Sequence, residues 1–183
     1  MTSALLTLYR HKTWATLRLI DYCRGIDVAH LDATIAGTFG TIRETLRHLV
    51  QAEEGYLFRL TGERLSEPIS EGPVALEDLA ERVRRMGPRW EVIAEDAELP
   101  DQEVITSDGW RLPAAIPMAQ AIHHADDHRS HVMSILGALG LDVPTPDGLD
   151  LWGYAEAEGL VEKVDESGSQ ELDARTPDAP NER

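Results

Sequence analysis

Three observations predict an all-α protein. Apolar residues recur at three- and four-residue steps along four long segments of the chain. The connections between these segments contain glycine and proline, and only residues 103–112 have the composition of short strands. The 183 residues suit one domain. We expect that domain at residues 1–161, followed at 162–183 by an acidic tail that is polar enough to be disordered.

The first helix is predicted at about residues 3–25, with Gly25 as its stop. Its apolar stripe consists of Leu6, Tyr9, Leu17, Ile20 and Cys23. Cys23 is therefore predicted to be a small core residue rather than a reactive thiol. His11 and Trp14 lie one turn apart on this helix. They either face a functional site or are a surface histidine and a packed tryptophan.

The second helix is predicted at about residues 41–60, opened by a capping box between Thr41 and Glu44. His48 falls on the flank of its apolar arc, and Glu53 falls close to the centre of that arc. A carboxylate at the centre would be costly to bury without a partner. Glu53 therefore requires a cation from another helix.

The third helix is predicted at about residues 75–97, where Gly87-Pro88 should kink it or split it in two. Residues 103–112 predict a β-hairpin with a turn at Asp108-Gly109. After a loop at 141–148, Asp150 can cap a short helix at about 151–158.

The fourth helix, at about residues 117–140, carries four of the seven histidines within nine residues. At about 100° per residue, His124, His128 and His131 share one face, and His123 points elsewhere. Arg129 falls near the centre of the apolar arc. We therefore expect a buried ion pair between Arg129 and Glu53.

The spacing of His124 and His128 is that by which a helix offers two imidazoles to one metal ion. If the second helix faces the fourth, His48 completes a three-histidine site with open positions for water or substrate, as in catalytic zinc centres. Nickel, cobalt and iron also accept imidazole. The alternative is a solvated helix face without metal. His131 could be a fourth ligand, a neighbour of the ligands or a surface residue.

The charge and composition exclude several classes of function. Seventeen basic residues stand against 33 acidic ones, a net charge of −16, which would repel a phosphate backbone, so we expect no nucleic-acid partner. No apolar run is long enough for a membrane helix, and the N-terminal residues do not look like a signal peptide. A single cysteine forbids an intrachain disulfide. We expect a cytoplasmic protein.

Several of these motifs, in this order, resemble the DinB-like, or YfiT-like, family of metal-dependent enzymes. The resemblance rests on Tyr9-Arg-His-Lys-Thr-Trp-Ala, Thr45-Leu-Arg-His-Leu-Val-Gln-Ala-Glu, Asp108-Gly109 and His124-x-x-x-His128-Arg129. It implies a four-helix bundle with up-down-down-up order and one crossover, often as a homodimer. It also implies that His48, His124 and His128 bind a divalent ion, commonly zinc or nickel. The chain departs from the family at Ser130-His131, where Gly-Gln or a similar pair is frequent.

The resemblance further implies a small-molecule substrate. Related proteins transfer a low-molecular-weight thiol such as mycothiol or bacillithiol, and one branch isomerises maleylpyruvate with mycothiol. Thiol transfer to an electrophile is therefore the first hypothesis, with metal-dependent hydrolysis and non-catalytic binding of a metal or ligand as alternatives. No catalytic residue is assigned. The residues expected around the ligands or in the pocket are His131, Glu53, Arg129, His11, Trp14 and Thr45.

Overall fold

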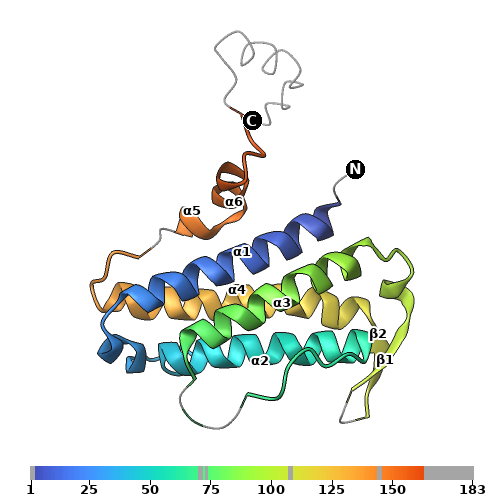
Figure 1. Cartoon of the computed structure of the whole chain (residues 1–183), viewed down its shortest axis with the longest axis horizontal. Coiled ribbons are helices and arrows are strands. Elements are labelled where there is room, and N and C mark those ends of the chain that lie inside the picture. The colour runs from blue at the N-terminus through green and yellow to red at the C-terminus, as the bar shows by residue number, and fades with distance from the viewer. Residues whose placement is uncertain (1–2, 70–71, 73, 107–108, 144–145, 163–183) are drawn as a thin grey trace, which may run out of the picture.

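The computed structural model of the protein describes residues 3–69, 72, 74–106, 109–143 and 146–162. Its long helices are α1 (Ala4–Gly25), α2 (Ile42–Thr61), α3 (Leu76–Glu95) and α4 (Ala115–Ala138), close to the predicted ranges. Figure 1 shows α2 and α3 running in the same direction, opposite to α1 and α4. The up-down-down-up order is therefore confirmed, and the α2–α3 connection is the crossover that runs the length of the bundle.

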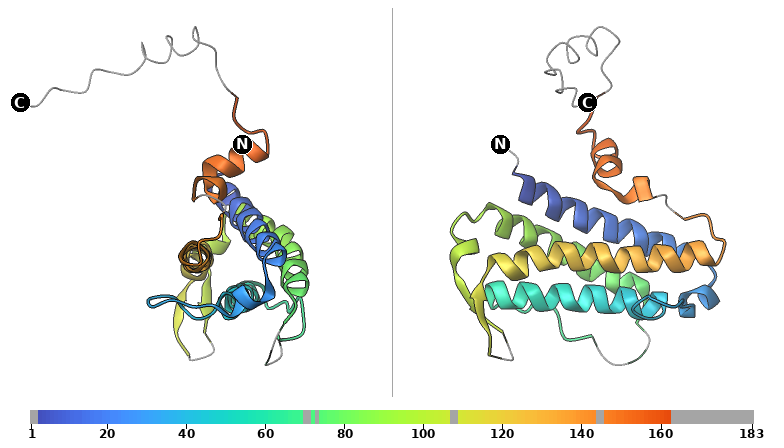
Figure 2. Two further views of the ribbon diagram at one scale, coloured as in Figure 1. Left: turned by 90° about the vertical axis from the view of Figure 1, so that its left-hand side faces the viewer. Right: turned by 180° about the vertical axis from the view of Figure 1, so that it is seen from behind.

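Two helix pairs dominate the packing. The most extensive contacts are those of α1 with α3 and of α2 with α4, and smaller contacts join α2 to α3 and α1 to α4. The bundle is therefore a ring in the order α1–α3–α2–α4, which the end-on view in Figure 2 also shows. Because α2 and α4 are antiparallel neighbours, the middle of α2 faces the middle of α4.

Local signals explain where α2 begins and ends. The Thr41 hydroxyl accepts a hydrogen bond from the Glu44 amide, and the Glu44 carboxylate accepts one from the Thr41 amide, as the predicted capping box requires. Gly62 ends the helix in the left-handed conformation, with φ of 70°. These two caps fix the register of α2 and hence the position of His48.

The helix α3 is continuous through Pro88, which excludes the split, one of the two predicted outcomes. Proline removes one backbone hydrogen bond from a helix interior. The apolar stripe nevertheless continues on both sides of it, with Met86 and Trp90 fully buried in the same core. Burial of these large side chains favours the packing of both halves of α3 against α1.

The remaining elements decorate the bundle. The antiparallel hairpin pairs β1 (Glu103–Ile105) with β2 (Arg111–Pro113), as predicted; Gly109 has a positive φ of 89°, and Asp108 lies outside the described residues. Short 3-10 helices occur at Val28–Asp32 and Leu99–Asp101. The segment α5 (Pro146–Leu149) replaces part of the predicted loop, and Asp150 caps α6 (Leu151–Ala157) as expected. The tail predicted at 162–183 falls almost wholly outside the described residues.

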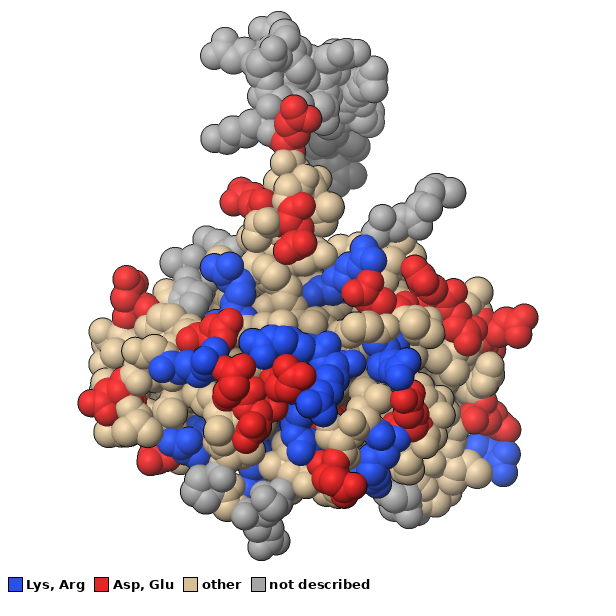
Figure 3. Space-filling model, in the orientation of Figure 1, with Lys and Arg blue, Asp and Glu red and all other residues tan. Residues whose placement is uncertain are grey.

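The surface carries interleaved charges. Figure 3 shows basic and acidic side chains alternating over the face formed by α1 and α3. Ion pairs there include Arg10–Glu91 and Arg24–Glu77. Within the described residues, no helix combines the length and apolarity needed to cross a membrane.

Candidate metal centre

The structure brings His48 of α2 together with His124 and His128 of α4. Each ring offers one nitrogen, and these three atoms lie within 4.8 Å of one another. The Nε2 atoms of His48 and His124 are 3.0 Å apart. The His48 ring centroid lies 4.8 Å from that of His128. Nitrogens bound to one divalent ion at about 2.0–2.1 Å lie about 3–4 Å apart, and the pair from His48 and His124 has that spacing.

The electrostatics of the cluster favour neutral rings. Burial, followed by the neighbouring His128 and His48, lowers the pKa of His124 to about 4. Burial, followed by His48 and His131, also lowers the pKa of His128 to about 4. Burial lowers the pKa of His48 as well. Since only a neutral imidazole has a lone pair to give, all three rings are ready to bind a cation at neutral pH.

These residues fit a divalent ion. The donors are three convergent neutral imidazoles, a set that zinc and nickel both accept. No fourth ligand belongs to the cluster among the described residues, so an ion held here would keep open positions. His123 points away from the cluster, as predicted, and its Nδ1 lies 3.1 Å from the Asp127 carboxylate.

Aromatic side chains surround the three rings. Phe39, in the connector before α2, stacks on His48 with ring centroids 4.2 Å apart and meets the His128 ring edge-on at 5.1 Å. Tyr56 meets His124 edge-on at 5.8 Å. The sequence interpretation missed both. The available clue was Phe39, a large apolar side chain between two glycines just ahead of the helix that carries His48.

Comparison with known proteins agrees with this architecture. The model of the DinB family matches residues 1–159. This chain belongs to the DinB family. A crystal structure described as that of a DinB-like protein from Bacillus cereus aligns with a TM-score of 0.59 and 19% identity, over 76% of this chain and 93% of that one. At that identity the likeness shows the fold, and a search of curated proteins gave no match.

The predicted Glu53–Arg129 ion pair of this DinB-family chain is wrong. Glu53 pairs with Lys12 of α1, and both side chains are 1% exposed. Arg129 instead donates hydrogen bonds to Asp126, to the Thr16 hydroxyl and to the Lys12 carbonyl oxygen. Lys12 lies on the buried face of α1, so its ammonium group contacts the Glu53 carboxylate directly. Glu53 and Arg129 still interact through their charges, which counteracts the effect of burial on the Arg129 pKa.

Other predicted site residues lie at varied distances from the cluster. The His131 ring lies 5.4 Å from that of His128, and its buried Nδ1 has no hydrogen-bond partner among the described residues. Thr45 is buried and donates its hydroxyl to the Thr41 carbonyl oxygen. The structure thus places His131 beside the centre, whereas the Thr45 side chain hydrogen-bonds to the backbone at the start of α2.

His11 and Trp14 face the C-terminal segment. The His11 Nε2 lies 2.7 Å from the Leu149 carbonyl oxygen, and both rings contact Tyr154 of α6. His11 and Arg129 also line a cleft of about 560 Å³ with Asp126, Ser130, Met133, Ser134, Val143, Leu149, Asp150 and Leu151. By helical phase this cleft lies on the side of α4 opposite His124 and His128. It is therefore separate from the histidine cluster.

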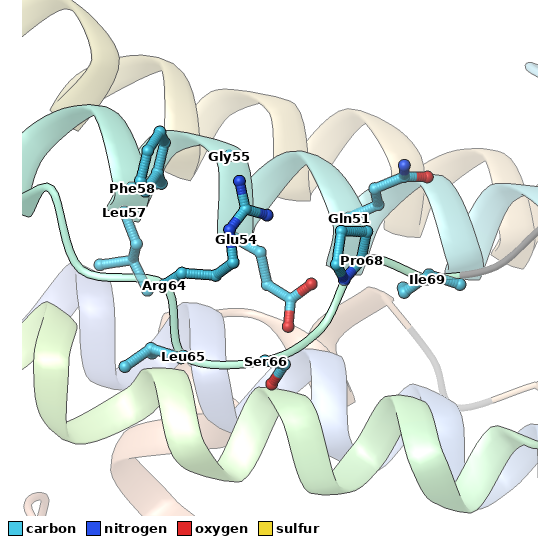
Figure 4. A pocket seen from close by; sticks show the side chains of 10 residues that line it. All are labelled: Gln51, Glu54, Gly55, Leu57, Phe58, Arg64, Leu65, Ser66, Pro68 and Ile69. Atoms are coloured by element: carbon cyan, nitrogen blue, oxygen red, sulfur yellow. The ribbon is translucent and has the colours of Figure 1, made fainter.

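A further pocket lies between α2 and the connector that follows it. The pocket has a volume of about 200 Å³. Figure 4 shows the residues that line it, which are Gln51, Glu54, Gly55, Leu57, Phe58, Arg64, Leu65, Ser66, Pro68 and Ile69. Glu54 is already engaged there by Arg82. None of the three clustered histidines lines this pocket.

Proposed function

We propose that this protein is a divalent-metal-dependent enzyme that transfers a low-molecular-weight thiol, of the mycothiol or bacillithiol kind, to an electrophilic small molecule. The observation that carries the proposal is the convergence of three neutral imidazoles from two antiparallel helices. Membership of the DinB family supports a metal-dependent reaction. Zinc and nickel are among the ions that a set of imidazole donors accepts.

The chain's own residues bind and orient in this proposal. The rings of His48, His124 and His128 hold the ion, and their lowered pKa values keep protons off the ligating nitrogens. When bound, a divalent ion supplies a Lewis acid that lowers the pKa of a thiol and stabilises the thiolate. The thiol proton would pass to solvent, the sulfur would bond to the electrophilic carbon, and the leaving group would depart with the electron pair of the broken bond.

The thiol must come from a co-substrate. Cys23 is the only cysteine of the chain and is fully buried in the core, as predicted. Burial raises the pKa of its thiol to about 12, so almost no thiolate forms at neutral pH. The sulfur nucleophile in a thiol transfer therefore cannot be the protein's own.

The test begins with metal content and ends with turnover. Untagged protein is analysed for bound metal and then assayed with monochlorobimane, which releases chloride when a thiol sulfur bonds to its reactive carbon. We expect thiol-dependent turnover that falls by more than about 100-fold in His124→Ala, because ligand loss removes the ion. His123→Ala is the matched control, since that ring points to Asp127 on the same helix.

Each alternative has its own outcome. Ester turnover without a thiol, lost in His124→Ala and kept in His123→Ala, would replace transfer by hydrolysis. Bound metal without either activity would indicate a non-catalytic binding protein. A protein that binds no zinc or nickel, and whose stability does not change in His48→Ala, would overturn the metal-dependent proposal altogether.

A further inference from the structure

Two of the three rings of the candidate centre have no hydrogen bond at Nδ1 among the described residues. A ligand histidine in most metal sites donates its second ring N–H to a carboxylate, carbonyl or water, which fixes the orientation of the ring. Here the Nδ1 atoms of His124 and His128 are buried and have no hydrogen-bond partner among the described residues. No hydrogen bond from another described residue therefore orients either ring through its Nδ1 atom.

The nearby carboxylates are engaged elsewhere. Glu44 accepts hydrogen bonds from Thr41 in the capping box. Asp126 accepts from Arg129, and Asp127 pairs with His123. Among the described residues, none of the three hydrogen-bonds a ring of the cluster, and Asp127 acts on His124 and His128 only through its charge, which counteracts the lowering of their pKa values.

Phe39 makes the ring contacts that could take over this role. Its ring is nearly parallel to that of His48, at 19°, with centroids 4.2 Å apart. It is nearly perpendicular to that of His128, at 85° and 5.1 Å. Stacked and edge-to-face arrangements are the two favoured geometries of aromatic pairs. One side chain thus contacts one ring from α2 and one from α4.

The connector that carries Phe39 is anchored on both sides. The Thr38 hydroxyl donates to the Ile35 carbonyl oxygen at 2.9 Å, and the Ile42 amide donates to the Ala33 carbonyl oxygen at 3.2 Å. The Phe39 side chain is nevertheless 51% exposed, so it adds little to the core. Its position is explained better by its two histidine contacts than by burial.

We propose that Phe39 is the positioning residue of this centre, holding the His48 and His128 rings by aromatic contact, which for His128 takes the place of a hydrogen-bonded acceptor. The inference rests on the proposed metal-dependent function and names a residue through which that site works. Phe39 does not itself touch the ion. Its ring limits the rotation of both imidazoles and shields one side of them from water.

The first test measures metal affinity in Phe39→Ala, Phe39→Leu and Phe39→Tyr by competition between the protein and a chelator for Co²⁺. We expect affinity about 10–100-fold weaker in Phe39→Ala, which is the usual cost of losing a residue that orients ligands. The Phe39→Tyr variant should keep the Co²⁺ affinity of the unchanged protein, because tyrosine retains an aromatic ring that can stack. The Phe39→Leu variant should lose affinity, because leucine has no such ring. The visible absorption of bound Co²⁺ should change with the same variants. Trp110→Ala, at a side chain 70% exposed in the hairpin, is the control.

The second test needs no metal. In the metal-free protein, the ring current of Phe39 should shift the His48 ring-proton resonances, and Phe39→Ala should abolish that shift. Affinity within twofold of the unchanged protein in Phe39→Ala, or full affinity in Phe39→Leu, would overturn the proposal, as would an unaltered His48 resonance. If the unchanged protein binds no Co²⁺ yet His48 responds to Phe39→Ala, the proposed function fails while the ring positioning stands.

Discussion

The side chains of Lys12 and Glu53 meet at the centre of the bundle, where each is 1% exposed. The Lys12 ammonium also lies 4.6 Å from the centroid of the Trp90 ring, a cation–π contact. Burial lowers the Lys12 pKa, and the Glu53 charge counteracts part of that effect. A charged residue from each of α1 and α2 thus occupies the core beside an aromatic ring of α3.

We expect Glu53→Gln to lower the free energy of unfolding by about 3–5 kcal/mol, because it leaves the Lys12 charge buried without its partner. Lys12→Met should cost a similar amount, and the double variant should cost clearly less than the sum. Urea unfolding at pH 7 measures all three. Glu91→Gln, which breaks a half-exposed surface pair with Arg10, is the control and should have little effect. Additive losses at Lys12 and Glu53 would contradict this account.

The sequence predicted that Glu53 would be buried and need a cation, but not which cation. Arg129 falls near the centre of the apolar arc of its helix, and this position makes it the cation that the sequence pairs with Glu53. The clue lay in the first helix, where Lys12 and Thr16 continue the buried face from Tyr9 to Leu19. Which of the two buried cations, Lys12 or Arg129, pairs with the Glu53 carboxylate depends on how the four helices pack against one another.

Among the elements, α3 packs most closely on α1, and Gly87 marks one point of their approach. A Cβ atom at position 87 would lie 3.1 Å from the Thr13 Cγ2, tighter than ordinary van der Waals contact. Glycine at position 87 has a low helix propensity, but its lack of a side chain allows α3 to pack closely against α1 at Thr13. Gly55 in α2 has no such neighbour, since its nearest atom is the flexible end of Arg59 at 3.8 Å.

Two glycine-to-alanine substitutions should consequently have opposite effects. Gly55→Ala should raise the free energy of unfolding by about 1 kcal/mol through helix propensity. Gly87→Ala should lower it, because the new methyl group presses on Thr13. In a Thr13→Ser background, which removes Cγ2, Gly87→Ala should become stabilising. Thermal and urea unfolding of the four variants measure this, and a stabilising Gly87→Ala in the original chain would refute the steric explanation.

Helix positions followed from the sequence because caps and apolar periodicity are local. The capping box at Thr41, the cap at Asp150 and the hairpin at 103–112 were all predicted where they occur. Of the two outcomes predicted at Pro88, a kink or a split, the split does not occur, because tertiary burial of Met86 and Trp90 outweighs the loss of one backbone hydrogen bond.

At the scale of the whole molecule, the arrangement of helices was available only through the family resemblance. Helical phase placed His124 and His128 on one face, but no spacing could show that α2 lies opposite that face. Phe39 was missed for the same reason, since a connector residue finds its neighbours only when the bundle closes. Local patterns thus predicted which histidines could form the site, whereas the packing of the helices determines that they lie together.

The cluster should make the metal-free protein sensitive to acid. Burial lowers the pKa of His124 and His128 to about 4 in the folded chain, whereas unfolding returns them to about 6.5. Between these values the unfolded chain binds more protons, so stability rises with pH across this window and is lost as pH falls. In excess chelator, the urea midpoint should be highest above about pH 6.5 and decline toward about pH 5. The His124→Asn/His128→Asn variant should decline less, and equal slopes would contradict the pKa shifts.

His48 and His124 are 76 residues apart in the sequence, yet their ring nitrogens meet across α2 and α4. With a single cysteine, the chain cannot tie these distant segments together by a disulfide. An ion held by both helices would act as a reversible cross-link enclosing the crossover, all of α3 and the hairpin in one loop. Closing a loop of this size restricts the unfolded chain by about 4 kcal/mol while the cross-link persists. A metal-loaded bundle would then unfold as a ring, and a chelator would return it to a linear chain.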